Sequence, residues 1–310
     1  MAGGSEIRQK ISELMPGRVF FDEPMSRHTS IGVGGPADVL AFPEGIEELT
    51  GLVSCLKEER VAFIPIGNCT NLIVRDGGFR GAMISLRNLQ GVDICPGEGD
   101  SVFIAAEAGV LLSHIVDLSV RESLSGIEFC AGIPGSIGGS VKMNAGAYGR
   151  EMKDVIQRVT LFNGQGDIRE VPGDDLPFTY RNLDIPEGTT ITGTVLHLSR
   201  GQKEKIEERV SEILAMRRGK HPLEYRNAGS VFKNLPGYPA GQIIDEVGLK
   251  GTQVGDAQVS EKHGNFIVNL GQATAGDVIS LIEIVRKRVM EQRGIALDTE
   301  VRIVGTGEAA

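Results

Sequence analysis

Long apolar runs are missing from this chain. None approaches the roughly 20 consecutive apolar residues that a helix needs to cross a bilayer. The opening segment MAGGSEIRQKISELM also lacks the apolar core of a secretory signal. We therefore expect neither membrane insertion nor export, and the sequence indicates a cytoplasmic protein.

The ligand spacings that cysteine and histidine adopt in metal sites are missing too. The five histidines form no HExxH motif, and the cysteines form no CxxC pair. Scattered cysteines are more typical of reduced thiols in a cytosol than of disulfides or metal sites. We therefore expect no structural metal. The four cysteines are Cys55, Cys69, Cys95 and Cys130.

An excess of basic residues is absent as well. The 310 residues carry a formal net charge of -9, with a pI near 5.2. This balance argues against nonspecific binding of nucleic acid, but a local basic cluster is compatible with a phosphorylated small molecule. The length favours two or three domains. A composition of 41% hydrophobic and 24% charged residues is that of a globular protein.

Glycine, by contrast, is abundant, and it is densest from Gly126 to Gly149, GIEFCAGIPGSIGGSVKMNAGAYG. Apolar residues separate the glycines where a surface linker would carry Ser, Lys or Glu, which predicts a buried loop. Glycine leaves no Cβ to block a ligand, successive amides can form a nest for anionic oxygens, and Pro134 stiffens the turn. A tight packing corner in a β-rich core explains the composition equally well. The apolar residues are Ile127, Phe129, Ile133, Ile137, Val141 and Met143.

Two shorter glycine-rich segments precede this one. Residues 26–40 contain a GxGGxA pattern, but a dinucleotide fingerprint lies between a strand and a helix. Here Pro36 and Asp38 lead into the apolar run 39–42, which favours a turn before a strand. Residues 67–71, GNCTN, follow a predicted strand directly. Their small hydrogen-bonding groups suit a diphosphate, and a plain β-turn is the alternative.

Hydrophobic periodicity predicts a mixed α/β chain with many strands. Asn163-Gly164 is a hairpin turn signal, and Thr274 and Asp277 stand where a helix cap and a first-turn acid belong. A change of composition suggests a domain boundary near residue 200. The predicted helices are 5–15, 44–59, 111–121, 202–218 (with Ile206, Val210, Ile213 and Leu214 facing inward) and 275–293. The predicted strands are 61–66, 81–86, 102–107, 155–162, 168–171, 190–198 and 299–304.

Taken together, these segments resemble the bacterial UDP-N-acetylenolpyruvoylglucosamine reductase family over roughly residues 20 to 305. Each motif alone is weak, but the set is specific. The short spacing from Arg181 to the charged helix resembles the compact branch that lacks an extra tyrosine-bearing loop. The matching motifs are Gly34-Gly35-Pro36-Ala37-Asp38, GNCTNLIV, AGIPGSIGGSVKMNAGAYG, Tyr180-Arg181, NAGSVFKN and Leu297-Asp298-Thr299-Glu300-Val301.

The resemblance implies an α+β (α/β) fold in two functional parts. Residues 34–200 would form an FAD-binding region of the vanillyl-alcohol-oxidase (PCMH) type, with two lobes split near residue 90. Residues 201–305 would form an α+β substrate-binding domain. Residues 1–33 would be an N-terminal helix and lead-in, and residues 306–310 a tail.

The resemblance also implies the reaction. NADPH would reduce FAD, and the reduced flavin would pass hydride to the methylene carbon of UDP-N-acetylglucosamine enolpyruvate, giving UDP-N-acetylmuramate for peptidoglycan synthesis. The implied partners are this substrate and NADPH, with no obligatory protein partner. Cell-wall biogenesis, cell shape, cell cycle and cell division are the processes that such an enzyme serves.

Three catalytic residues follow from the resemblance. Ser230 would donate a proton to the substrate, a role that requires its hydroxyl to be held close to the carbon. Arg181 would bind the substrate carboxylate. Glu300 would act protonated, or held by Arg181, because an ionised glutamate repels a developing enolate. The structural alternatives are a turn serine, a surface arginine beside an aromatic residue and an exposed glutamate at a strand start.

Binding residues are assigned on the same basis. For the charged and polar residues assigned to the substrate, a solvent-exposed basic face without a binding role is the alternative. The cofactor set is Gly67, Asn68, Cys69, Thr70, Asn71, Gly132, Ile133, Pro134, Gly135, Ser136, Gly138, Gly139, Asn144, Ala145, Gly146 and Ala147. The substrate set is Tyr180, Arg217, Lys220, Lys233 and Asn234.

The chain departs from the family pattern at two positions. Cys69 stands where glycine is common, which puts the local backbone in question. Asp256 stands where the family mostly has a glycine. Neither change touches the proposed chemical groups.

Two other functions fit parts of the pattern. An oxidase on the same FAD scaffold would not need Arg181, Ser230 and Glu300, and air would reoxidise its flavin when an alcohol is the substrate. A nucleotide-binding protein without turnover would stay yellow when NADPH is added. The resemblance favours the reductase over both.

Overall fold

The computed structural model describes residues 3–164 and 166–307, so the last three residues of the predicted tail lie outside the described chain. The chain folds into two compact units, each made of three segments. The first unit comprises residues 1–21, 39–68 and 81–215, and the second comprises 22–38, 69–80 and 216–310. No helix in the described ranges is both long and apolar enough to span a membrane.

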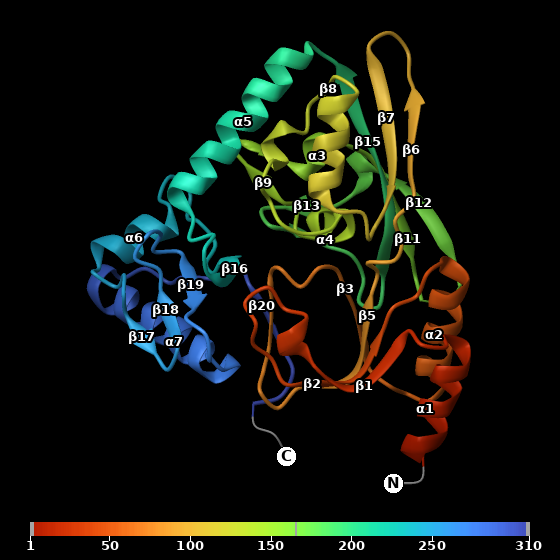
Figure 1. Ribbon diagram of the computed structural model, residues 1–310, viewed down its shortest axis with the longest axis horizontal. Coiled ribbons are helices and arrows are strands. Elements are labelled where there is room, and N and C mark those ends of the chain that lie inside the picture. Colours follow the sequence, from red (N-terminus) through yellow and green to blue (C-terminus); the bar gives the residue numbers. More distant parts are fainter. Residues whose placement is uncertain (1–2, 165, 308–310) are drawn as a thin grey trace. The chain divides into compact units, whose positions relative to one another are not determined.

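The chain combines helices with longer runs of consecutive strands (Figure 1). The helices are α1 Gly3–Leu14, α2 Ile46–Glu58, α3 Leu112–Arg121, α4 Ile137–Lys142, α5 Lys203–Lys220, α6 Ala240–Glu246 and α7 Ala275–Arg293. The strands up to the glycine-rich segment are β1 Val19–Pro24, β2 Pro36–Ala41, β3 Phe63–Ile66, β4 Leu72–Val74, β5 Phe79–Ser85, β6 Val92–Pro96, β7 Ser101–Glu107 and β8 Leu124–Ser125. The later strands are β9 Gly146–Ala147, β10 Arg150–Glu151, β11 Ile156–Phe162, β12 Ile168–Pro172, β13 Phe178–Thr179, β14 Asn182–Leu183, β15 Thr190–Arg200, β16 Arg226–Ser230, β17 Gln253–Val254, β18 Ala257–Val259, β19 Phe266–Asn269 and β20 Arg302–Val304.

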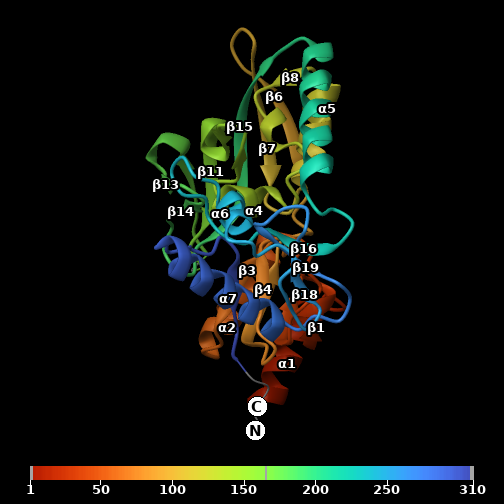
Figure 2. The ribbon, with the colours of Figure 1, turned by 90° about the vertical axis from the view of Figure 1, so that its left-hand side faces the viewer.

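The larger sheet of the first unit is antiparallel and runs in the order β12-β11-β15-β7-β6. Strand β7 alternates strictly, with Val102, Ile104 and Ala106 buried and their neighbours half-buried, as a strand with one covered face should. The turn between β6 and β7 projects from this sheet (Figure 2). β11 and β12 pair across the Asn163-Gly164 turn, which confirms the predicted hairpin.

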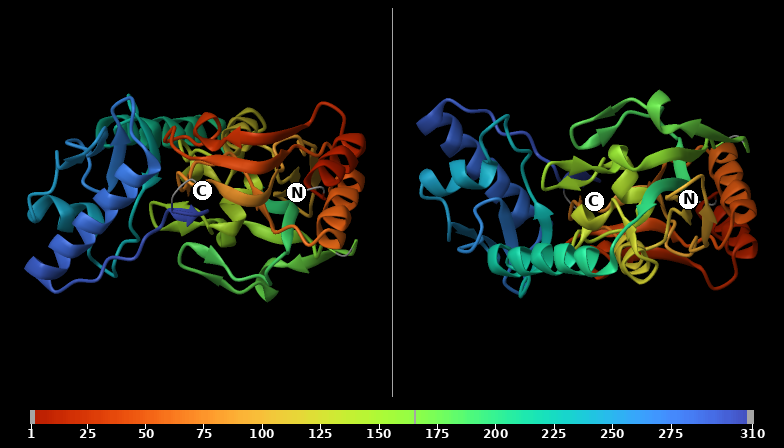
Figure 3. Two further views of the ribbon diagram at one scale, coloured as in Figure 1. Left: turned by 90° about the horizontal axis from the view of Figure 1, so that it is seen from below. Right: turned by 90° about the horizontal axis from the view of Figure 1, so that it is seen from above.

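A second sheet has the strand order β1-β2-β5-β3, and its β3 and β5 are parallel. Three of the five boundaries between the units fall within β1, β2 and β5. Helix α1 packs against α2 (Figure 3). The residues of α2 spaced by three and four are all buried, because that spacing places them on one helical face, as predicted. They are Leu49, Leu52, Val53 and Leu56.

The glycine-rich segment 126–149 is only partly buried, because Gly132, Pro134, Tyr148 and Gly149 are exposed, and it is not one continuous loop. It contains α4, whose N-cap Ser136 accepts the N–H of Gly139 at 3.4 Å. A Cβ atom on Gly138 would lie 2.8 Å from the Cβ of Ala108, so glycine is required there by close packing. Two adjacent glycines are poor helix formers, and tertiary packing against residue 108 overrides that preference.

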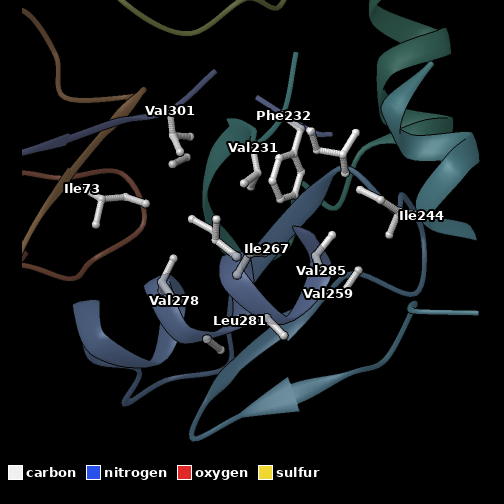
Figure 4. Close-up of a cluster of buried hydrophobic side chains, with 14 of the residues drawn as sticks. Ile73, Val231, Phe232, Ile244, Val259, Ile267, Val278, Leu281, Val285 and Val301 are labelled. Carbon is white, nitrogen blue, oxygen red and sulfur yellow. The ribbon is translucent and has the colours of Figure 1, made fainter. Parts of the chain in front are cut away.

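The second unit contains the antiparallel sheet β16-β19-β18-β17 and the helices α6 and α7. Its apolar core joins this sheet to α7 and to residues near β4 and β20 (Figure 4). Helix α7 has the predicted bounds and a capping box between Thr274 and Asp277, and it ends at Gly294, which has φ +67°. The carboxylate of Asp76 also accepts the N–H groups of Ala275 and Gly276 at 2.9 and 2.7 Å.

Two local predictions need correction. The predicted strand 299–304 is a strand only from Arg302, where β20 pairs in parallel with β4. Helix α5 buries Ile206 and Ile213 fully, whereas the other two residues expected to face inward are only half-buried. The sequence alone cannot distinguish a half-covered helical face from a fully covered one.

Candidate active site

Arg181 lies at the tip of a very short hairpin in the first unit. Strands β13 and β14 pair over two residues each, with Tyr180 and Arg181 between them. Arg181 has φ +59°, a left-handed conformation that costs a non-glycine residue about 1 kcal/mol or more. Its guanidinium carbon lies 5.0 Å from the Tyr180 ring centroid, and its Nη2 donates to the carbonyl of Gly146 at 3.0 Å. A hairpin this short cannot hold such a conformation by itself.

Lys142, at the end of α4, is one of the groups that hold the hairpin. Its Nζ donates to Asn182 Oδ1 at 3.1 Å and to the carbonyl of Leu183 at 2.5 Å. The last helical residue of the glycine-rich segment is thus bound directly to the strand that follows Arg181.

Asn144 holds the other strand of the hairpin. Its side chain is completely buried, and its Nδ2 donates to the carbonyl of Thr179 and to Glu151 Oε2, both at 3.0 Å. Its Oδ1 accepts the N–H of Lys153 at 3.1 Å. Both amide hydrogens and the oxygen of the side chain are therefore hydrogen-bonded within the protein. A cofactor contact of Asn144 would have to use its backbone.

Two of the predicted cofactor segments meet within the first unit. A Cβ atom on Gly67 would lie 2.6 Å from Ser136 Oγ, so the glycine lets the two segments touch. The N–H groups of Ile137 and Gly138 donate to the protein backbone at 2.8 and 2.9 Å. Among the described residues, no acceptor lies within hydrogen-bonding range of the N–H groups of Gly135 and Ser136.

These two amides test whether an anionic cofactor group fits. Ser136 is 2% exposed, and a buried N–H without an acceptor is rare because it costs free energy. Gly135 has φ +135°, a conformation that suits glycine. Consecutive amides of this kind can bind an anionic oxygen, so the segment fits a diphosphate.

In the second unit, Cys69 and Asn71 do not merely form a turn. Cys69 has φ +51°, a left-handed conformation that favours glycine, and its carbonyl accepts the N–H of Ser30 at 3.2 Å. The Nδ2 of Asn71 donates to the carbonyl of Glu300 at 3.0 Å, and its own carbonyl accepts the N–H of Arg302 at 3.0 Å. The predicted cofactor residue Asn71 therefore holds the backbone of the predicted catalytic residue Glu300.

A β-bulge presents Ser230. Strand β16 pairs with β19 in regular register at Asn227 opposite Val268, but Ser230 lies opposite Phe266, so β16 contains one extra residue. Gly229 within the bulge has φ +75°. A bulge redirects the side chains that follow it, and Ser230 is left half-buried at the strand end.

Glu300 lies beside the segment that follows Ser230. Its N–H donates to the carbonyl of Val231 at 2.8 Å, and Phe232 and Thr299 form an antiparallel bridge next to it. The structure therefore brings Ser230 and Glu300 onto neighbouring backbones of the second unit, while Arg181 belongs to the first.

The predicted substrate residues of the second unit differ in their surroundings. The Oδ1 of Asn234 accepts the N–H of Ala240 at 3.0 Å, where α6 begins. Lys233 is half-buried, Arg217 is half-buried near the end of α5, and Lys220 is exposed. Tyr180, in the first unit, is 43% exposed. Their roles in substrate binding stay a prediction.

Sequence reasoning missed a histidine pair near this sheet. The rings of His221 and His263 lie 5.6 Å apart, and each lies 4.9 Å from the ring of Phe266, the residue opposite Ser230. Burial and then the charge of Arg217 lower the pKa of His221 to about 4, and burial lowers the pKa of His263. Both rings are therefore neutral at pH 7. Within the described part of the chain, no three His, Cys, Asp or Glu side chains are grouped to hold a metal ion.

The departure at Asp256 has a local structural role. Its Oδ2 accepts the N–H of Gln272 at 2.9 Å, and its carbonyl accepts the N–H of Leu270 at 2.8 Å. The side chain thus orders the turn that leads into α7, which a glycine could not do.

Comparisons with known proteins match most of the chain. Residues 221–304 match the family model "UDP-N-acetylenolpyruvoylglucosamine reductase, C-terminal domain", and residues 37–172 match "FAD binding domain". The UDP-N-acetylenolpyruvoylglucosamine reductase of Syntrophus aciditrophicus is 51% identical over 96% of both chains. That of Caldanaerobacter subterraneus subsp. tengcongensis is 43% identical over 96% of this chain and 97% of its own.

A solved structure agrees. The reductase of the same name from Thermus caldophilus is 38% identical, covers 91% of this chain and 97% of its own, and superposes with a TM-score of 0.77. The predicted fold class, α+β with an FAD-binding region of the vanillyl-alcohol-oxidase type, is confirmed. The chain therefore belongs to the UDP-N-acetylenolpyruvoylglucosamine reductase family, and it is an FAD-dependent oxidoreductase.

Proposed function

We propose that Arg181, Ser230 and Glu300 act on the enolpyruvyl group of the substrate in this chain. The family reaction is the NADPH-dependent reduction of UDP-N-acetylglucosamine enolpyruvate to UDP-N-acetylmuramate through FAD. The observation that supports the assignment most directly is the hydrogen bond from Glu300 N–H to the Val231 carbonyl, next to the bulge that presents Ser230.

FAD, when bound, supplies the hydride chemistry between NADPH and the substrate. We assign its diphosphate to the segment around Gly67, Gly135 and Ser136, because the N–H groups of the half-buried Gly135 and the buried Ser136 offer consecutive donors to an anion. The other assigned cofactor residues remain part of this proposal. Asn144 is retained only for its backbone, because its side chain is fully engaged.

Ser230 donates the proton that completes the reduction. A serine hydroxyl is a weak acid, so it acts only when held within about 3 Å of a strongly basic carbon and correctly aligned. The bulge at Gly229 provides a fixed backbone for that alignment.

Arg181 and Glu300 manage the charge of the substrate. The planar guanidinium of Arg181 matches a carboxylate in a bidentate arrangement. Glu300 orients the same carboxylate while protonated, because an ionised side chain would repel the negative charge that develops. Tyr180, Arg217, Lys220, Lys233 and Asn234 are the proposed contacts for the rest of the UDP-sugar.

The organisation and setting of the enzyme follow the same proposal. Residues 34–200 bind FAD and residues 201–305 bind the substrate. The enzyme works in the cytoplasm on a nucleotide-linked sugar and NADPH, and through peptidoglycan synthesis it serves cell shape, cell cycle and cell division.

Anaerobic measurement of the two half-reactions tests the proposal. In the Ser230→Ala protein, reduction of FAD by NADPH should stay near normal, whereas reoxidation by UDP-N-acetylglucosamine enolpyruvate should slow by two or more orders of magnitude, on the order of the loss of a general acid. Ser280→Ala, which changes an exposed serine of α7 in the second unit, is the matched control. Equal slowing of both halves would remove Ser230 from the role of acid. Rapid flavin reoxidation by air with an alcohol would favour an oxidase instead.

A further inference from the structure

Asn265 makes three hydrogen bonds to the two residues that follow Ser230. Its Nδ2 donates to the carbonyl of Phe232 at 2.8 Å, and its Oδ1 accepts the N–H of Phe232 at 2.9 Å. Its backbone carbonyl accepts the N–H of Val231 at 2.8 Å. The side chain is 3% exposed, so water does not compete for these bonds.

The side-chain amide of Asn265 makes the two hydrogen bonds to Phe232 that the backbone of a neighbouring strand would otherwise make. On one side of Phe232 lies the segment around Thr299, which bonds to the residues just before and just after Phe232. Because successive residues of an extended chain direct their N–H and carbonyl groups to opposite sides, the N–H and carbonyl of Phe232 point to the other side. On that other side the chain turns between His263 and Phe266, whose backbones bond to each other at 3.0 Å. The backbone carbonyl of Asn265 continues the hydrogen-bond ladder at Val231, and its side chain continues the ladder at Phe232.

The bulge before Ser230 is fixed independently. Asn227 Oδ1 accepts the N–H of Gly229 at 3.0 Å, and the Ser30 hydroxyl donates to the carbonyl of Asn227 at 2.7 Å. A Cβ atom on Gly229 would meet nothing within 4 Å, so the left-handed backbone rather than crowding is what requires glycine. Ser230 thus lies between two segments that are each held by a buried or half-buried asparagine.

We propose that Asn265 is a positioning residue for the proton transfer by Ser230. The inference rests on the proposed role of Ser230 and deepens it. Asn265 fixes the peptides of Val231 and Phe232, and the Val231 carbonyl in turn holds the N–H of Glu300. One side chain therefore sets the backbone positions of both groups, without touching the substrate.

A proton donor that is weak by nature depends steeply on this placement. A displacement of about 1 Å of a reacting group can cost on the order of 100-fold in rate. Removing the amide of Asn265 leaves the N–H and carbonyl of Phe232 without partners and frees the segment to move. The loss should therefore appear in proton transfer and not in the reduction of FAD by NADPH.

The experiment uses the full-length protein loaded with FAD, under anaerobic conditions. In Asn265→Ala, reoxidation by UDP-N-acetylglucosamine enolpyruvate should slow on the order of 100-fold, and its solvent deuterium isotope effect should rise, because proton transfer becomes limiting. Reduction by NADPH should change by less than about threefold. Gly229→Ala, which strains the bulge without a steric clash, should show the same split.

Asn269→Ala is the matched control. Asn269 is also a buried asparagine, it belongs to β19, and its Nδ2 donates to the carbonyl of Ile31 at 3.0 Å, at the end of the strand away from Ser230. Its removal should lower the thermal unfolding midpoint, yet slow neither half-reaction selectively. A selective loss in this control equal to that in Asn265→Ala would overturn the proposal, because any buried asparagine would then suffice.

A double variant separates positioning from general loosening. In a Ser230→Ala background, Asn265→Ala should slow the second half-reaction no further, because the group that it positions is gone. Slowing by the same factor with and without the hydroxyl would overturn the inference, as would equal slowing of both halves. If Asn265→Ala fails to fold, Asn265→Asp, which keeps only the acceptor, and Gly229→Ala decide in its place.

The failure of the inference differs from the failure of the proposed function. A normal Asn265→Ala protein beside a slow Ser230→Ala protein overturns this inference alone. A Ser230→Ala protein with a normal second half-reaction overturns both.

Discussion

Arg181 and Ser230 are held in their units in different ways. Arg181 lies on a hairpin with two residues in each strand, and the side chains of Lys142 and Asn144 fix that hairpin from outside. Ser230 ends a strand of a four-stranded sheet with its own apolar core, and a bulge with one extra residue sets its direction. The first arrangement depends on a few polar contacts, and the second depends on register.

This difference predicts different failures. Of the hairpin residues 178–183 only Leu183 is buried, so the hairpin can loosen locally while its unit stays folded, because few buried contacts oppose its opening. A strand such as β16, by contrast, can move only if the backbone hydrogen bonds that pair it with β19 are broken or shifted.

Arg181→Ala should have the largest effect. Loss of the guanidinium should slow reoxidation of reduced flavin by the enolpyruvyl substrate by about 100-fold to 1,000-fold, as for other single groups that stabilise developing charge. Arg181→Lys should recover only part of the rate, because a point charge cannot bind a carboxylate bidentately. Stopped-flow absorbance of the flavin gives both rates.

The exposed Arg158 of β11 provides the control. Arg158→Ala should leave both half-reactions unchanged. If Arg181→Ala slows reduction by NADPH as much as the second half, its carboxylate-binding role is wrong.

Asn144→Ala should lower the stability of the first unit and loosen the hairpin. The change leaves the Thr179 carbonyl, Glu151 and the Lys153 N–H without their buried partner, so we expect the free energy of unfolding to fall by about 3 kcal/mol. Hydrogen exchange of residues 178–183 should accelerate more than that of β11. Denaturant unfolding and exchange measured by mass spectrometry check the two effects.

The matched control is Asn88→Ala, because Asn88 is half-buried and its Nδ2 makes one longer bond of 3.3 Å to the carbonyl of Phe42. It should cost about 1 kcal/mol or less and leave exchange in the hairpin unchanged. Exchange that rises uniformly through the first unit in Asn144→Ala would contradict the idea of a locally held hairpin.

The two sites also differ in how far the sequence could predict them. Helix α7 follows from local rules, since its cap residues, its buried stripe and its terminal glycine all lie within a few positions of one another. The Asn163-Gly164 hairpin follows for the same reason. Helix α4 does not, because the contact of Gly138 with Ala108 that favours it is distant in sequence.

The site itself was predicted by residue type, not by geometry. NAGS and DTEV identify Ser230 and Glu300 as candidates through the family resemblance, but the bulge is a property of pairing with β19. The roles of Asn144 and Asn265 were missed because each joins segments that are far apart in sequence. A single sequence contains no signal that tells a buried bridging asparagine from a turn asparagine.

The smallest effect concerns pH and the second unit. The folded-state pKa of His221 is lowered to about 4, mainly by burial, so folding favours the neutral ring. Its contribution to stability is complete above the unfolded pKa near 6.5 and is lost as the pH falls from there through 4. The thermal unfolding midpoint should therefore decline over this range, and His221→Phe should flatten the decline.

His114→Gln, at an exposed position of α3, is the control and should leave the slope as it is. The first and second units can be compared in one experiment by following exchange in each as the pH falls. A His221→Phe protein with the full slope would show that other groups cause the decline.

The pairing of β4 with β20 has a consequence for synthesis on the ribosome. Asn71 and Glu300, which bond to each other beside this pair, are 229 positions apart. Closing so long a loop is entropically costly and slow, so residues 69–80 must wait, without their final neighbours, until residues 300–304 have emerged. A nascent chain stalled before residue 300 would have Ser230 but no partner for β4, so the proposed chemistry becomes possible only after β20 has been made.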